Sequence, residues 1–225
     1  MSARYDGFAS WYDEHIGRYT AAAGDVIERL LGAGPGRCLD LCCGTGVHLH
    51  TLLALGWQVT GVDSSSDQLR VARERVGDDI ELVKADAAVL PFRDGQFDAV
   101  VSMFSHTDAD DFSAIVGEGA RVLGRGGTFV YVGIHPCFVG PHSLYGADQP
   151  VPELHPGYSE LGRPQEAPGI RPDGLWARVA GVHLPLAVLL HAFFDAPLRL
   201  DTVEEHRDEG EGYPRRIVLR ARRDA

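Results

Sequence analysis

The sequence predicts one α/β domain organised around a mainly parallel β-sheet, and three observations support this prediction. Residues 37–63 contain an apolar strand, a glycine-rich turn, a helical pattern and a second apolar strand, in the length that a βαβ unit needs. Further apolar runs of strand type follow at 80–85, 97–103 and 128–133, with helical patterns between them. The chain has 225 residues, of which 44% are hydrophobic, and this suits one globular domain with a sizeable core.

Two helices are expected before the first strand. Residues 3–20 place aromatic and apolar side chains at helical spacing, and residues 21–31 place aliphatic side chains on one face. Glycines between positions 32 and 36 end the second helix. On this pattern alone, the first segment is a helix that packs on the domain.

The glycine-rich turn indicates a nucleotide site. Gly44 and Gly46 have no Cβ, so the backbone can take a positive φ and a ligand can approach it closely. The helix expected at 47–55 would point its unpaired N–H groups at that ligand. Asp63 stands at the carboxyl end of the second strand, where it can accept hydrogen bonds from two ribose hydroxyls.

The sequence DLCCGTG at 40–46 resembles the first motif of class I S-adenosylmethionine-dependent methyltransferases, written D-x-G-x-G-x-G. It departs from that motif at Cys42, where the family commonly has a glycine. A nicotinamide-dependent dehydrogenase is the competing interpretation, but its G-x-G-x-x-G fingerprint needs a small residue at position 49, which is leucine here. The motif therefore favours a methyltransferase of the small-molecule, type 11/25-like group.

The resemblance implies a Rossmann-like fold, with seven mainly parallel strands and an antiparallel last strand, in a single domain over residues 1–225. The segment RYDGFASWYDEH resembles the N-terminal segment that folds over the cofactor in this family, which makes residues 1–32 a helical lid. The implied cofactor is S-adenosyl-L-methionine. The resemblance assigns its binding to Tyr5, Tyr12, Asp40, Cys42, Gly44, Thr45, Gly46, Asp63, Ser64, Asp86, Ala87, Met103 and His106.

The later elements follow the same family order. Serines at 64–66 can cap the helix after the second strand, and the strand at 80–85 leads to Asp86, which in this family binds the adenine amine. A helix is expected at 110–123, stopped by the glycines of 124–127, before the strand at 128–133.

Composition changes after that strand. Residues 134–180 are rich in proline and glycine, so no long helix is expected there, and the aromatic residues among them argue against disorder. We interpret this segment as a cap insertion that covers the substrate. A helix at 184–196 and a closing hairpin of strands 198–206 and 214–222 complete the expected fold.

Methyl transfer from a sulfonium mainly needs alignment and exclusion of water, so catalytic residues are weakly specified. His106 at the end of the fourth strand and His135 after the fifth are the candidate bases. The alternatives are a hydrogen-bonding or cofactor-contact role for His106 and a loop-stabilising role for His135. The cluster Asp108, Asp110 and Asp111 fits the N-terminus of a helix.

No metal is expected, because His135, Cys137, His142 and His155 lack the paired spacing of a zinc site. The net charge of −11 disfavours nucleic acid as substrate. The chain has no run long enough to cross a membrane and no signal-peptide pattern, so a cytoplasmic location is expected. Monomer and homodimer are both compatible with the sequence.

The predicted function is O- or N-methylation of a small organic acceptor, with an acceptor of secondary metabolism as a hypothesis. The aromatic residues of the lid and the cap suggest that this acceptor is partly apolar. A domain that binds S-adenosylmethionine without transferring the methyl group, as a cyclase or a regulatory module, is the first alternative. The dehydrogenase is the second.

Overall fold

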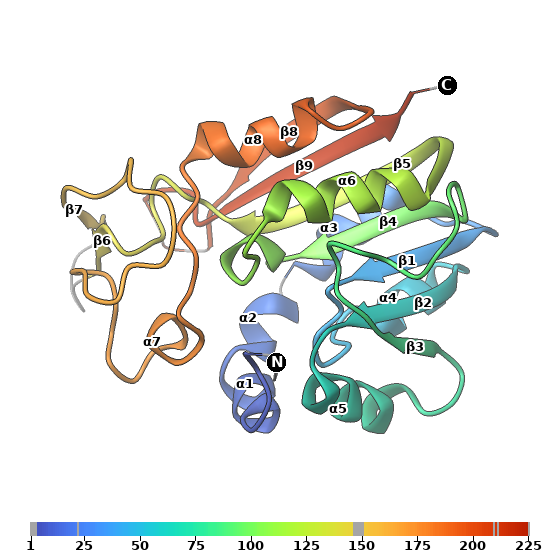
Figure 1. The fold of residues 1–225 in the computed structure, drawn as a ribbon, viewed down its shortest axis with the longest axis horizontal. Coiled ribbons are helices and arrows are strands. Elements are labelled where there is room, and N and C mark those ends of the chain that lie inside the picture. Colours follow the sequence, from blue (N-terminus) through green and yellow to red (C-terminus); the bar gives the residue numbers. More distant parts are fainter. Residues whose placement is uncertain (1–3, 22, 146–150, 209, 211, 225) are drawn as a thin grey trace.

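A seven-stranded sheet forms the centre of the computed structural model, which describes residues 4–21, 23–145, 151–208, 210 and 212–224 (Figure 1). The strand order is β3-β2-β1-β4-β5-β9-β8. The strands are β1 (Arg37–Leu41), β2 (Gln58–Asp63), β3 (Glu81–Lys84), β4 (Phe97–Met103), β5 (Leu123–Ile134), β8 (Leu198–His206) and β9 (Arg216–Arg223).

The sheet is parallel from β3 to β5 and antiparallel around β9. Strand β1 pairs in parallel with β2 and β4, while β9 runs antiparallel to both β5 and β8. The predicted fold, with an antiparallel last strand, is confirmed. The hairpin lies with β9 against β5, so β8 forms the edge, and its alternation of half-buried and exposed residues fits that place.

Helices cover both faces of the sheet. One core lies between the sheet and α3 (Gly24–Leu31), α4 (Leu49–Ala54) and α5 (Ser66–Val76), and the other lies under α6 (Phe112–Val122) and α8 (Leu186–Phe194). Ser65 is the N-cap of α5 and accepts a hydrogen bond from the Gln68 N–H, as the run of serines predicts. Two short helices, α1 (Ala9–His15) and α2 (Gly17–Ala21), precede α3, and α1 contacts α5.

The prediction that the glycines of 124–127 separate a helix from the fifth strand is wrong, because these glycines lie within β5. Helix α6 passes directly into β5 at Leu123, and the pairing of β4 with β5 shifts register between Phe97 and Ala99. A Cβ at Gly127 would lie 2.8 Å from the Gly124 carbonyl oxygen and 2.9 Å from that of Asp98. The glycines therefore permit a tight irregularity within the strand.

The predicted cap lies outside the main sheet, on the side where β4 and β5 end (Figure 1). It holds a two-stranded ribbon of β6 (Ser143–Leu144) and β7 (Glu153–Leu154) and the short helix α7 (Leu175–Val179). The Arg178 guanidinium of α7 lies 4.3 Å from the Trp11 ring centre in α1, so the cap and the N-terminal helices touch. Residues 1–3 and 22 of the predicted lid and 146–150 of the predicted cap lie outside the described residues.

Candidate functional site

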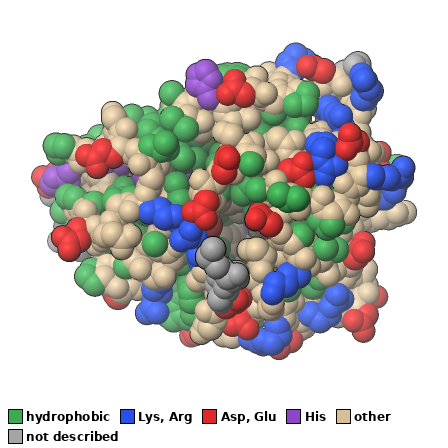
Figure 2. Space-filling view, viewed as in Figure 1, with side chains coloured by type: hydrophobic (Ala, Val, Ile, Leu, Met, Phe, Trp, Pro, Cys, Tyr) green, Lys and Arg blue, Asp and Glu red, His purple; other side chains and the backbone are tan. Residues whose placement is uncertain are grey.

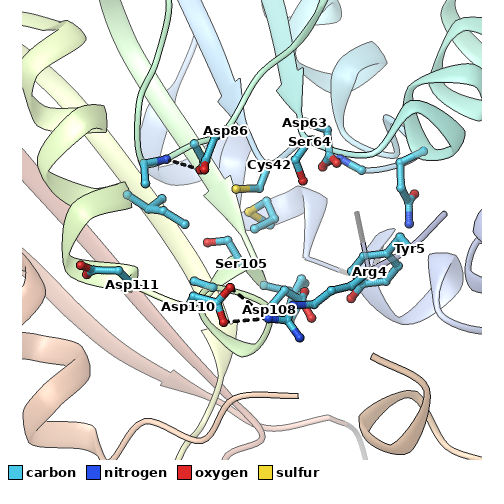
Figure 3. Close-up of a pocket in the computed structure, with 18 of the residues that line it drawn as sticks. Arg4, Tyr5, Cys42, Asp63, Ser64, Asp86, Ser105, Asp108, Asp110 and Asp111 are labelled. Atoms are coloured by element: carbon cyan, nitrogen blue, oxygen red, sulfur yellow. Dashed lines mark hydrogen bonds and ion pairs between the residues drawn. The ribbon is translucent and has the colours of Figure 1, made fainter. Parts of the chain in front are cut away.

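A cavity of about 600 Å³ lies where β1, β2 and β4 end, beneath the N-terminal helices (Figure 3). The carboxyl ends of parallel strands meet at one edge of a sheet, which is where ligands bind in open α/β folds. Several Asp and Glu side chains gather around a hollow near the middle of this face of the molecule (Figure 2).

Most of the predicted cofactor residues meet at this cavity. Those that line it are Tyr5, Tyr12, Cys42, Gly44, Asp63, Ser64, Asp86, Ala87 and Met103. Asp40 and Thr45 line a smaller hollow of about 40 Å³, which shares Tyr12, Cys42, Gly44 and Met103 with the larger cavity. Gly46, His106 and His135 line neither space.

Position 42, where this chain has a cysteine and the family motif has a glycine, keeps a left-handed backbone. Cys42 has a φ of 63°, and Gly44 and Gly46 also have positive φ. A side chain in this conformation costs about 1–2 kcal/mol, so the cysteine is tolerated at a price in stability. Gly46 has a different requirement, since a Cβ there would lie 2.8 Å from Leu49 Cδ1 and 3.1 Å from Ala72 Cβ. Close packing of α4 and α5 therefore explains Gly46, although it lines no cavity.

Asp63 connects the turn to the second strand. Its carboxylate accepts hydrogen bonds from the Gly44 N–H at 3.0 Å and the Ser65 N–H at 2.9 Å. Burial raises the pKa of Asp63, and these backbone hydrogen bonds oppose that shift. Asp86 is exposed and accepts a hydrogen bond from the Ala88 N–H at 2.9 Å. The two carboxyl groups come from neighbouring strands and approach the same cavity (Figure 3).

A polar contact that the sequence pattern does not reveal ties the first helix to the turn. The Asp13 carboxylate in α1 accepts hydrogen bonds from the Thr45 hydroxyl at 2.7 Å and from Arg75 Nη2 at 2.8 and 2.9 Å. The Tyr5 and Tyr12 rings, which line the cavity, pack edge to face with centroids 5.1 Å apart. The N-terminal helices are thus attached over the cavity through side chains of α5 and the turn.

Two buried carboxyl groups have unsatisfied oxygens. Burial raises the pKa of Asp40 and of Asp108 from 3.8 to about 7 in each case. Asp40 Oδ2 and Asp108 Oδ1 are buried and have no hydrogen-bond partner among the described residues. Asp108 belongs to the predicted helix-start cluster, but only Asp111 caps α6, by accepting from the Ala114 N–H at 2.9 Å. The cavity position of Asp108 was missed because residue type and spacing suit a cap equally well.

The two candidate bases lie away from the cavity. His106 is 2% exposed, and its Nδ1 forms a hydrogen bond with the Tyr131 hydroxyl in the core. Burial lowers its pKa to about 3, so the ring is neutral near pH 7. His135 is 1% exposed, and its Nε2 lies 2.7 Å from a Glu205 carboxylate oxygen, while its Nδ1 accepts from the Cys137 N–H. These contacts favour the hydrogen-bonding and loop-stabilising alternatives over proton transfer.

The described part of the chain contains no group of three or more His, Cys, Asp or Glu side chains placed to hold a metal ion. Within the same residues, no helix combines the length and the apolar character required to cross a bilayer.

Comparison with known proteins gives matches in sequence and in structure. Residues 38–127 match the family model described as "Methyltransferase domain". A demethylmenaquinone methyltransferase of Thermus thermophilus is 37% identical over 125 residues, which are 53% of this chain and 56% of the relative. The chain spans about half the length of the curated relatives it matches.

Solved structures resemble the chain over nearly all of its length. An S-adenosylmethionine-dependent methyltransferase from Mesorhizobium loti has a TM-score of 0.72 at 23% identity, over 97% of this chain and 99% of that one. A geranyl diphosphate methyltransferase in complex with GPP and sinefungin has a TM-score of 0.64 at 19% identity, over 92% of this chain and 78% of that one. The sequence match thus identifies a methyltransferase domain at residues 38–127, and the solved structures show that the whole chain shares the fold of S-adenosylmethionine-dependent methyltransferases.

Proposed function

We propose that this protein transfers the methyl group of S-adenosylmethionine to oxygen or nitrogen of a small organic acceptor. The observation that carries the proposal is the meeting of the glycine turn, Asp63 and Asp86 around one cavity at the carboxyl ends of the strands. The match of residues 38–127 to a methyltransferase domain covers the turn and both carboxylates, which supports the same cofactor.

The residues at the cavity suit this cofactor. Gln68 is 2% exposed and lines the cavity, and its Oε1 atom has no hydrogen-bond partner among the described residues. It can therefore accept a hydrogen bond from a nucleoside. Asp40 and His48 line the smaller hollow, and their Oδ2 and Nε2 atoms are buried without a hydrogen-bond partner in the part of the chain that the structure describes. A carboxyl group and an imidazole there fit the polar end of an amino acid. We assign Asp63 to the ribose hydroxyls, Asp86 and Ala87 to the adenine, and the smaller hollow to the methionine end.

When bound, S-adenosylmethionine supplies a methyl group on a positively charged sulfur. The cavity carries several carboxyl groups and one guanidinium, that of Arg4, among the described residues that line it. Negative charge attracts a sulfonium more strongly than the neutral product, so the wall favours binding of the donor. Tyr5 and Tyr12 cover the cavity and help to exclude water.

The acceptor is proposed to be small and partly apolar because aromatic rings of the N-terminal segment line the cavity. Oxygen and nitrogen acceptors both remain within the proposal, and a compound of secondary metabolism is the class we would screen first. Of the residues that the family resemblance assigns to the cofactor, those that line the cavity or the smaller hollow are proposed as cofactor contacts. His106 and His135 line neither space, so we do not propose either as a base.

Calorimetric titration with S-adenosylhomocysteine and with NAD tests the proposal directly. We expect S-adenosylhomocysteine to bind and NAD to show no binding. Formation of S-adenosylhomocysteine from S-adenosylmethionine is then measured with a panel of amines, phenols and alcohols. Binding of NAD alone, or of neither ligand, would contradict the cofactor assignment. Cofactor binding without methylation of any acceptor class would favour the cyclase or regulatory alternative.

A further inference from the structure

One carboxyl oxygen on the cavity wall, Asp108 Oδ1, has no hydrogen-bond partner among the described residues. The described residues that line the cavity include five carboxylates, Asp63, Asp86, Asp108, Asp110 and Asp111, and one cation, Arg4. The proposed function uses Asp63 and Asp86, which leaves three carboxylates in the segment between β4 and α6.

Two of these three are already satisfied within the protein. Asp111 caps α6 through the Ala114 N–H. Asp110 pairs with Arg4 Nη2 at 2.7 Å and with Arg163 Nη2 at 2.7 Å, so the guanidinium on the cavity wall is itself occupied. Arg163 also donates to the backbone carbonyl of Asp108, at 3.2 Å, and not to its carboxyl group.

Asp108 differs from both. The Tyr5 hydroxyl forms a hydrogen bond with its carboxyl group, but the Oδ1 atom is buried and has no hydrogen-bond partner among the described residues. The carboxyl group lies near Arg4, Asp110 and Tyr5 (Figure 3). A buried oxygen that stays unpaired lowers the stability of the protein, because it has lost its hydrogen bonds to water. This oxygen can therefore accept a hydrogen bond from a ligand in the cavity.

We propose, on the basis of the proposed function above, that the acceptor is an amine, which binds as an ammonium ion against Asp108 and gives its proton to that carboxylate. The aromatic rings of Tyr5 and Tyr12 line the same cavity and can attract a cation through their faces. An ammonium N–H supplies the charge-assisted donor that Oδ1 lacks.

Charge and acidity disfavour the other acceptor classes. A carboxylate or phenolate acceptor would be repelled by a wall with several acidic groups and one paired cation. An alcohol is too weak an acid to give its proton to a carboxyl group. Burial raises the pKa of Asp108 to about 7, which brings it nearer to that of an amine and so improves proton transfer.

The reaction balances with the groups named. The ammonium proton moves to an Asp108 carboxylate oxygen, and this frees the nitrogen lone pair. That pair forms the new bond to the methyl carbon while the carbon–sulfur bond breaks, and its electrons stay on the sulfur. The products are the methylated amine, with one positive charge on nitrogen, and neutral S-adenosylhomocysteine, with Asp108 protonated.

The test uses binding as well as turnover. The full-length protein is saturated with S-adenosylhomocysteine and titrated with 2-phenylethylammonium, benzylammonium and hexylammonium, each compared with the alcohol of the same skeleton. We expect the ammonium probes to bind roughly tenfold or more tightly than the alcohols, as expected from a charge-assisted hydrogen bond. Asp108→Asn should remove that preference, and its affinity for S-adenosylhomocysteine should stay within about twofold of wild type.

Asp111→Asn is the matched control, because it removes a carboxylate of the same segment and can still cap α6. It should retain the preference for ammonium. Equal binding of ammonium and alcohol probes, no binding of either series, or a preference that survives in Asp108→Asn would overturn the proposal. So would methylation of hydroxyl compounds alone. Failure of S-adenosylhomocysteine to bind the wild type would instead refute the proposed function, so the two failures are distinct.

Discussion

Replacing Asp63 by Ala should weaken both cofactor binding and folding, since the same carboxylate holds the glycine turn and faces the cavity. It accepts the Gly44 N–H at 3.0 Å and the Ser65 N–H at 2.9 Å. Hydrogen bonds to a charged group contribute about 1.5–3 kcal/mol each. In the variant, the Gly44 and Ser65 N–H groups can donate to water in the cavity, and the cost of burying the Asp63 charge is removed. We therefore expect the free energy of unfolding to fall by about 2–3 kcal/mol in total.

The expected measurements follow from that figure. For a chain of this length, each kcal/mol shifts the melting temperature by about 2–4 °C, so Asp63→Ala should melt roughly 4–12 °C below wild type. Loss of the ribose contacts should weaken S-adenosylhomocysteine binding by about 10- to 150-fold, corresponding to about 1.5–3 kcal/mol. Calorimetric titration and thermal unfolding measure the two effects separately.

Asp63→Asn should fall between wild type and Asp63→Ala, because the amide keeps one acceptor and loses the charge. Asp78→Ala is the control. The Asp78 side chain is fully exposed, and its Oδ1 atom lies 3.6 Å from Arg73 Nη1 near the end of α5, so this ion pair contributes little to stability. It should match wild type in both assays. An Asp63→Ala protein that melts with wild type and binds S-adenosylhomocysteine with unchanged affinity would refute the reasoning on the turn and the ribose together.

Three further predictions concern the glycine turn, Asp40 and helix α1. Gly46→Ala should unfold at a lower temperature than Gly77→Ala. Both glycines have positive φ, but only at position 46 would a Cβ lie 2.8 Å from Leu49 Cδ1. Equal melting temperatures of the two variants would contradict this. In the ligand-free protein, wild type should lose stability relative to Asp40→Asn as the pH rises from about 4 to about 7. The reason is that burial raises the pKa of Asp40 from 3.8 to about 7, so only the folded state keeps the proton over this range. A difference in the free energy of unfolding by urea that does not change with pH would contradict this. Asp13→Asn should speed hydrogen exchange in α1 and weaken S-adenosylhomocysteine binding by roughly three- to tenfold, because it breaks a half-buried ion pair of about 1 kcal/mol with Arg75. Glu14→Gln is the control and should change neither quantity, since the neighbouring Glu14 side chain is 80% exposed.

The cofactor side of the cavity was largely predictable from the sequence. The turn at 40–46, Asp63 and Asp86 each lie at or just beyond the carboxyl end of a strand whose apolar run is visible in the sequence. In a parallel sheet, strand ends meet at one edge, so local position along the chain is enough to place these residues together. The Cys42 departure was visible as well, but only the structure shows that the left-handed backbone is kept there.

The acceptor side was not predictable in the same way. His106 was a candidate base because it follows β4, yet it turns into the core to contact Tyr131, and Asp108, two residues later, reaches the cavity instead. Within a short irregular segment, a side chain can point to either side of the sheet, and no periodicity determines which.

The sequence by itself determined the fold class, the order of the strands and helices, and the residues of the nucleotide turn, because these depend on local patterns of apolar residues and glycines. The tertiary structure decided which polar groups share the cavity. Asp13 and Arg75 are 62 positions apart, and Asp110 and Arg163 are 53 apart, before packing brings each pair together. Such contacts depend on how separate helices and loops meet over the sheet, and a single sequence carries no local signal for that.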